Sequence, residues 1–257
     1  MAQIDICKVG KTFDLGGTAA VQAIQELDFS IVEGEIFSLL GPSGCGKSTI
    51  LEIVAGFVAP SRGAVIVDGK PVTKPGPDRT MVFQQPNLFP WLTVLDNVMF
   101  GPRVQGQRAK AAALKRARHL LDICGLGGFE NKFPYQLSGG MRQRVAIVRA
   151  LINQPRVLLM DEPFGALDAQ TRLTMQEFLL AIWEELHPTI MFVTHDIDEA
   201  LFIGSRVGVM SRRPGRMSLE LEVPIPRPRN ADMLTMPVFV DLKSRLLHEL
   251  RSESGPH

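Results

Sequence analysis

The chain has 257 residues, 45% of them apolar, and a formal net charge of +1, which allows one large or two small globular domains. A charge so near zero gives no general attraction to nucleic acid or to an anionic membrane. The three cysteines, at positions 7, 45 and 124, fit neither a disulfide framework nor a Cys-x-x-Cys metal site and favour a reducing compartment. We expect no signal peptide, because the N-terminus carries an acid and lacks a basic start followed by an apolar core. We expect no membrane-spanning segment, because no apolar run reaches the about 20 residues that cross a bilayer.

The first third of the chain predicts strands around a glycine-rich loop. An apolar run at 36–40 has the pattern of a buried strand and leads directly into that loop, and a helix is expected to follow as far as Gly56. Further strands are expected at 4–9, at 21–32 after a turn at Gly16-Gly17, in a hairpin over 64–73 that turns at Asp68-Gly69, and at 79–83.

The rest of the chain alternates helices with apolar runs. Residues 88–155 predict a helical subdomain, which includes a basic helix over 107–124. Three runs of strand character follow, at 157–160, 190–193 and 207–210, and their alternation with helices predicts a parallel α/β sheet. The tail from Pro224 is rich in Pro and Arg and is expected to end in one amphipathic helix at about 238–251.

Residues 41–48 match the phosphate-binding pattern Gly-x-x-x-x-Gly-Lys-Ser in full. The glycines let backbone N–H groups cradle phosphate oxygens, and the helix that follows adds its positive N-terminal end. Lys47 is expected to reach the β- and γ-phosphates and Ser48 to bind Mg²⁺, whereas Cys45 reads as a small filler of the loop. The candidate ATP-binding residues of this loop are Gly41, Pro42, Ser43, Gly44, Cys45, Gly46, Lys47, Ser48 and Thr49.

Two adjacent acids, Asp161 and Glu162, end the apolar run at 157–160. In a phosphate-binding-loop protein the first acid holds Mg²⁺. The second is then expected beside the γ-phosphate, where a carboxylate polarises the attacking water.

Several motifs together resemble the ATP-binding cassette (ABC) family. The loop at 41–48, the run Leu137-Ser-Gly-Gly-Met-Arg-Gln-Arg144 and the acidic strand end at 157–162 occur in the order of that family. Gln84, Gly165-Ala-Leu-Asp168 and His195 resemble its glutamine loop, D-loop and switch histidine. The resemblance implies a RecA-like P-loop core with a parallel sheet, an antiparallel β subdomain and the helical insertion at 88–155. It implies one ABC ATPase domain over 1–225 and a short tail over 226–257.

The resemblance also implies roles for single residues. Gln84 would join the Mg²⁺ and water shell, and His195 would hydrogen-bond the γ-phosphate and orient the water or Glu162. Ser138, Gly139 and Gly140 would meet the ATP held mainly by the opposite subunit, at the positive end of a helix that starts near Met141. Asp168 would lie across the dimer interface, although it also reads as a helix N-cap.

Phe13 is the candidate for stacking on adenine, where a Tyr is more usual in the family. Phe keeps the stacking face and loses the hydroxyl. The alternative is an ordinary core or loop Phe.

The sequences of segments 89–98, 161–172 and 210–216 are similar to those of importers of the nitrate, sulfonate and taurine type. This implies ATP-driven uptake of a small anion or organic acid by a peripheral protein on the cytoplasmic face of the inner membrane. The expected partners are a second, identical ATPase subunit, a transmembrane permease bound through the apolar region 85–100, and, indirectly, a periplasmic or lipid-anchored binding protein. The alternative for Leu88, Phe89 and Trp91 of this region is a place partly in the core, and both can hold. No nucleic-acid partner is expected, because the basic residues of 108–118 read as a solvated helix face. The alternative class is a soluble ABC ATPase that acts on nucleic acid or ribosomes.

Overall fold

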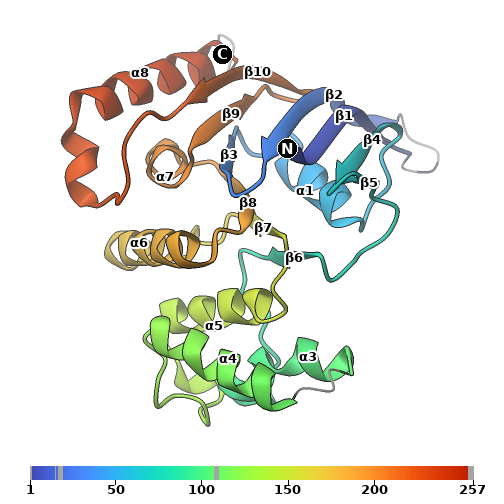
Figure 1. Ribbon diagram of the computed structural model, residues 1–257. Helices are drawn as coiled ribbons and strands as arrows, with labels where there is room; N and C mark the ends of the chain where they lie inside the picture. Colours follow the sequence, from blue (N-terminus) through green and yellow to red (C-terminus); the bar gives the residue numbers. More distant parts are fainter. Residues whose placement is uncertain (1, 15, 17–19, 107–109, 254–257) are drawn as a thin grey trace. The chain divides into compact units, whose positions relative to one another are not determined.

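The structure is a computed structural model that describes residues 2–14, 16, 20–106 and 110–253 (Figure 1). The chain forms two compact units, one of Met1–Gly76 with His187–His257 and one of Pro77–Leu186. Each unit is described by itself below. No helix of the described residues is both long enough and apolar enough to cross a membrane.

The first unit is built on a mixed sheet with strand order β5-β4-β1-β2-β10-β9-β3-β8. Antiparallel pairs join β1 to β2 and to β4, and parallel pairs join β3 to β8 and to β9. β10 connects these two parts, because it runs antiparallel to β9 and parallel to β2. The strands are β1 (Ala2–Phe13), β2 (Val21–Val32), β3 (Ile36–Leu40), β4 (Arg62–Val67), β5 (Lys70–Pro71), β8 (Thr189–Thr194), β9 (Arg206–Met210) and β10 (Gly215–Glu222).

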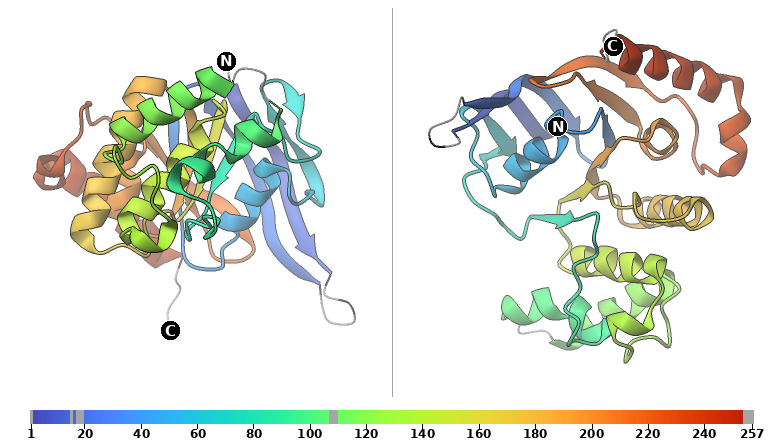
Figure 2. Two further views of the ribbon diagram at one scale, coloured as in Figure 1. Left: turned by 90° about the horizontal axis from the view of Figure 1, so that it is seen from below. Right: turned by 180° about the vertical axis from the view of Figure 1, so that it is seen from behind.

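Helices cover both faces of the parallel strands in this unit. Every residue of β3 and of β8 is buried, as expected for central parallel strands with helices on both sides. Figures 1 and 2 show α1 and α7 on opposite faces of β3, and α8 packs on the outer side of α7. The helices of the unit are α1 (Lys47–Ala55), α7 (Ile197–Ile203), the 3-10 helix η2 (Ala231–Thr235) and α8 (Pro237–Ser252).

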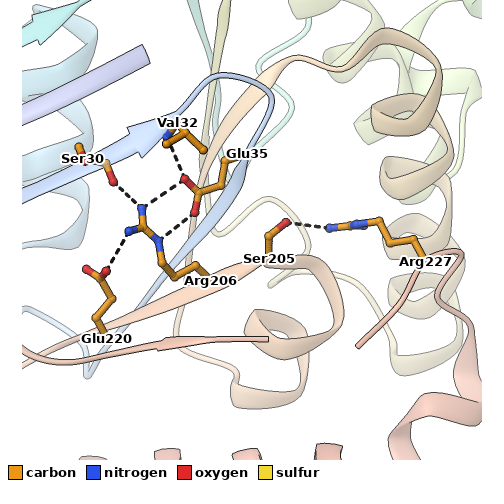
Figure 3. Close-up of polar contacts among 7 residues, drawn as sticks. All are labelled: Ser30, Val32, Glu35, Ser205, Arg206, Glu220 and Arg227. Atoms are coloured by element: carbon orange, nitrogen blue, oxygen red, sulfur yellow. Dashed lines mark hydrogen bonds and ion pairs between the residues drawn. The ribbon is translucent and has the colours of Figure 1, made fainter. Parts of the chain in front are cut away.

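Arg206 ties the two parts of this sheet together (Figure 3). Its Nε and Nη2 donate to the Glu35 carboxylate at 2.9 and 3.2 Å, and its Nη1 donates to Glu220 Oε1 at 2.9 Å. Nη2 also donates to the carbonyl oxygen of Ser30, and the guanidinium lies 4.9 Å from the centre of the Phe37 ring. One half-buried cation therefore joins β2, β9, β10 and the turn before β3.

The second unit pairs two short parallel strands with a group of helices. β6 and β7 are in parallel register, with Val82 opposite Met160. α5 contacts α2, α4 and α6, and Figures 1 and 2 show it between α6 and α4. The elements are β6 (Arg79–Val82), α2 (Val94–Val98), α3 (Phe100–Val104), α4 (Lys110–Ile123), the 3-10 helix η1 (Pro134–Gln136), α5 (Gly139–Leu151), β7 (Val157–Asp161) and α6 (Ala169–Leu186).

The structure confirms most of the elements expected from the sequence, including the hairpin that turns at Asp68-Gly69. Two details differ. The helix expected to begin near Met141 begins at Gly139, and β10 was not expected as a strand. Gly17 of the expected first turn and residues 107–109 of the expected basic helix lie outside the described residues.

Candidate nucleotide-binding and catalytic residues

The glycine-rich loop leaves the end of β3 and enters α1 at Lys47. Gly44 and Gly46 have φ values of 76° and 107°, a region that glycine adopts without the steric cost of a Cβ atom. Gly46 is the N-cap of α1 and offers no side chain to cap its first turn. The loop thus has the backbone geometry of an anion cradle in front of a helix N-terminus.

Lys47 is almost fully buried, with 4% of its surface exposed. Its Nζ donates hydrogen bonds to the carbonyl oxygens of Gly41 and Pro42, at 2.8 and 2.9 Å, and lies 4.0 Å from Cys45 Sγ. The ammonium is therefore held inside the loop, where a phosphate could replace carbonyl partners. Ser48 lies one residue further along α1 and is exposed, and Thr49 is half-buried.

His195 follows the strand next to the one that leads into the loop. β3 and β8 are parallel neighbours with Leu40 opposite Thr194, so the loop and His195 leave the sheet at the same edge. His195 is exposed. The structure brings these two predicted site elements together within the first unit.

Hydrogen bonds fix the backbone on both sides of His195. Thr194 Oγ1 accepts from the backbone N–H of Asp196 at 3.0 Å and donates to the buried carboxylate of Glu199. The Asp196 side chain caps α7 by accepting from the Glu199 N–H at 3.1 Å. Sequence reasoning missed Glu199, since a single acid in the first turn of a helix has no distinctive pattern.

Phe13 ends β1 opposite Val21 and is half-buried. The Nζ of Lys11 lies 4.9 Å from the centre of its ring. A base stacked on Phe13 would use the other face of the ring.

In the second unit, Gln84 and Glu162 converge on Gly165. β6 and β7 are parallel neighbours, so Gln84 and the Asp161-Glu162 pair leave the same edge of this strand pair. A Cβ atom on Gly165 would lie 3.3 Å from Gln84 Nε2 and 3.9 Å from Glu162 Oε2. The predicted glutamine and the predicted general base therefore share one small space, which a side chain at Gly165 would narrow.

The backbone of Glu162 is strained. Its φ of 45° lies in the left-handed region, which costs about 1–3 kcal/mol for a residue other than glycine. Such strain is concentrated at functional sites, where the surrounding structure over-determines the conformation.

The run Leu137–Arg144 forms the start of α5. Ser138 is the N-cap, and its Oγ accepts from the Met141 N–H at 3.3 Å. A Cβ atom on Gly140 would lie 2.9 Å from Thr171 Cγ2, so the glycine allows α5 to approach α6 closely. A pocket of about 280 Å³ opens here, lined by Ser138, Gly140 and Arg144 of α5 and by Gln170 and Thr171 of α6.

Asp168 lies just before α6 and is exposed. Its Oδ1 accepts from the Thr171 N–H at 3.0 Å, which is the N-cap arrangement considered from the sequence. Hydrogen bonds from the Thr171 hydroxyl and backbone lower the pKa of Asp168, so the carboxylate is ionised at neutral pH.

The family of the chain follows from comparison with known proteins. Residues 24–165 match the family model described as ABC transporter. The chain belongs to the ABC transporter ATPase family. It is therefore an ATP-binding enzyme with the P-loop fold expected from its motifs.

Individual relatives cover most of the ABC ATPase chain. It is 50% identical over 224 residues to a taurine import ATP-binding protein of Ruegeria pomeroyi, a match that covers 87% of this chain and 83% of the relative. It is 45% identical over 243 residues to an uncharacterized ABC transporter ATP-binding protein of Methanocaldococcus jannaschii, which covers 95% and 89% of the two chains.

Two solved structures support the same assignment. One is a dimeric ATP-binding cassette in a post-hydrolysis state with ADP and Pi, with a TM-score of 0.74, 35% identity and coverage of 87% of this chain and 100% of that chain. The other is a Clostridium perfringens protein described as part of an ABC transporter complex, with a TM-score of 0.77, 26% identity and 99% coverage of both chains.

Proposed function

We propose that this ABC ATPase is the motor subunit of an importer, in which two copies close around two ATP molecules and reopen after hydrolysis. The observation that carries this proposal is the Ser138-capped start of α5, in the same chain as a complete phosphate-binding loop. A loop alone needs only one nucleotide-binding chain, whereas the run at 137–144 has a role only against the ATP of a second subunit. The names of the taurine import relatives favour uptake, of a small anion or organic acid.

Within this proposal, the loop N–H groups and Lys47 bind the phosphates of ATP, and Phe13 stacks on adenine. Ser138, Gly139, Gly140 and Asp168 face the ATP of the opposite subunit. The pocket at the start of α5 lies beside this face, and the close approach of Gly140 to α6 keeps the run at 137–144 and the Asp168 region together.

The proposed metal ligands are Ser48, Gln84 and Asp161. They offer a hydroxyl, an amide and a carboxylate oxygen, the hard donors that Mg²⁺ prefers, so the donor set fits this ion. When bound, Mg²⁺ would neutralise phosphate charge.

Glu162 is proposed as the general base. Its carboxylate takes a proton from water as the water oxygen bonds to the γ-phosphorus and the bond to the β–γ bridging oxygen breaks, which gives ADP and phosphate. Gln84, which converges with Glu162 on Gly165, orients this water, and His195 donates a hydrogen bond to the γ-phosphate.

The proposed permease contact is the region 85–100. Phe89 packs against Trp91 and Phe100, with ring centres 5.6 and 4.6 Å apart, and 70% of the Trp91 surface is exposed. An exposed aromatic cluster of this kind suits a protein partner. We propose that this contact holds the subunit peripherally on the cytoplasmic face of the membrane, and that the substrate-binding protein acts through the permease.

For the domain organisation, we propose one ABC ATPase domain over 1–225, with the helical subdomain of the family at 88–155, and a short tail over 226–257.

The test of the catalytic assignment is ATP hydrolysis by Glu162→Gln. The substitution keeps size and hydrogen bonding but removes the base, so kcat should fall at least about 100-fold while ATP binding is kept. Lys47→Ala is the companion variant and should lose ATP affinity. Turnover at the wild-type rate in Glu162→Gln would remove Glu162 from the role of base.

A further inference from the structure

The loop between β9 and β10, residues 211–214, is built against the phosphate-binding loop. A Cβ atom on Gly215 would clash with the Cys45 carbonyl oxygen and would lie 2.6 Å from Met210 Cε. A Cβ atom on Gly41 would lie 3.0 Å from the Met210 carbonyl oxygen. The two loops therefore approach each other at backbone distance, within one unit.

Ser211 gives the β9–β10 loop a fixed shape. Its side chain is 3% exposed, its N–H donates to the Arg216 carbonyl at 2.9 Å, and its Oγ accepts from the Arg216 N–H at 3.1 Å. The Oγ also lies 3.1 Å from the Arg212 carbonyl oxygen, to which it donates. A loop closed in this way presents the two arginines at its tip in a defined position.

The Arg213 side chain lies near Gly44 of the phosphate-binding loop. A Cβ atom on Gly44 would lie 3.9 Å from Arg213 Nη2, so the guanidinium lies beside the outer turn of that loop. Arg213 is exposed, and it forms no ion pair with any acid that the structure describes. None of the described acids therefore pairs with its charge, which lies next to a loop whose backbone is shaped for an anion.

We infer that Arg213 is a nucleotide-binding residue, which supplies a second cation, besides Lys47, to the phosphate chain of ATP. The inference rests on the proposed role of the phosphate-binding loop. A guanidinium suits this task because it carries several N–H donors in a planar fork that matches phosphate oxygens. Arg213 reaches the phosphates from the solvent side, whereas Lys47 reaches them from inside the loop.

The test is titration of the full-length protein with a fluorescent ATP analogue. Arg213→Ala should weaken binding about five- to tenfold at low ionic strength, because an exposed cation near several phosphate charges contributes modestly. The loss should shrink as salt is added, and Arg213→Lys should recover part of the affinity.

The matched control is Arg212→Ala, which removes the neighbouring exposed arginine of the same loop. It should change affinity less than about twofold. An unchanged affinity in Arg213→Ala, or an equal loss in both variants, would overturn the inference. Lys47→Ala separates a failure of the Arg213 inference from a failure of the phosphate-binding loop assignment. If Lys47→Ala keeps the wild-type ATP affinity, the phosphate-binding loop itself is misassigned. If Lys47→Ala loses ATP affinity and Arg213→Ala does not, only the role of Arg213 fails.

Discussion

Arg229 is a buried cation that holds the end of a helix. It is 7% exposed, and its Nη1 donates to the carbonyl oxygens of Leu201, Phe202 and Gly204 at 3.0, 3.1 and 2.8 Å. They belong to the last turn of α7 and to its C-cap, Gly204, where carbonyls have no partner within the helix and favour a positive charge. Burial, with a smaller contribution from Arg227, lowers the pKa of Arg229 to about 9, which leaves the guanidinium protonated at neutral pH.

We predict that Arg229→Met lowers the free energy of unfolding by about 3 kcal/mol, because it leaves several buried carbonyls without donors. Urea denaturation at pH 7 measures this loss. Arg212→Met, at an exposed position, is the control and should stay within about 0.5 kcal/mol of the wild type. A loss below about 1 kcal/mol in Arg229→Met would show that water replaces the guanidinium at these carbonyls.

At the scale of residues, sequence reasoning works where a pattern requires particular atoms at particular spacings. Lys47 and Ser48 could be named because the loop pattern fixes their positions relative to the glycines. Arg229 could not, since Pro-Arg-Pro-Arg reads as an irregular tail and the helix-end carbonyls that it binds are more than 20 residues away in the chain. Arg213 lies in the stretch 210–216 that is similar to importers, but only the folded loop brings it to Gly44.

The aromatic segment after β6 is held in shape by one buried side chain. Asn97 is 0% exposed, and its Oδ1 accepts from the Phe89 N–H at 2.8 Å while its Nδ2 donates to the carbonyls of Phe89 and Leu92, both at 3.1 Å. These bonds hold the backbone at Phe89 and at Leu92, on either side of the exposed Trp91.

We predict that Trp91→Ala leaves the ATPase rate of the isolated protein within about twofold of the wild-type rate. Its free energy of unfolding should stay within about 0.5 kcal/mol of the wild type. In the assembled transporter it should cut permease-stimulated ATP hydrolysis at least about fivefold, as loss of an interface anchor would. Phe57→Ala is the control, because Phe57 is also a large exposed aromatic, at 55%, and lies outside 85–100. Full stimulation in Trp91→Ala would place the permease contact elsewhere.

At the scale of elements, continuous apolar runs predicted β3, β7 and β8 well, because central parallel strands are buried on both faces. β10 was missed, since Gly215–Glu222 mixes charged and apolar residues and belongs to the part of the sheet that is open to solvent. The start of α5 was placed two residues late, because two glycines argue against a helix, whereas the Ser138 cap starts it there.

For the whole molecule, the motifs predicted the fold class and the family, and the comparisons confirm both. The sequence did not predict that β10 would join the antiparallel and parallel strands into one sheet. That arrangement depends on pairings between β10 and both β2 and β9, which no local pattern encodes.

The central claim is that two copies form an ATP-dependent clamp, and the most direct measurement is the molar mass of Glu162→Gln by light scattering. With ATP and Mg²⁺ this variant should be a dimer, because it binds ATP without consuming it, and without nucleotide it should be a monomer. Adding Ser138→Arg to this variant should restore the monomer while ATP binding is kept, since the larger side chain would lie on the face proposed to meet the partner subunit. A Glu162→Gln protein that binds ATP and stays monomeric at every concentration tested would contradict the account.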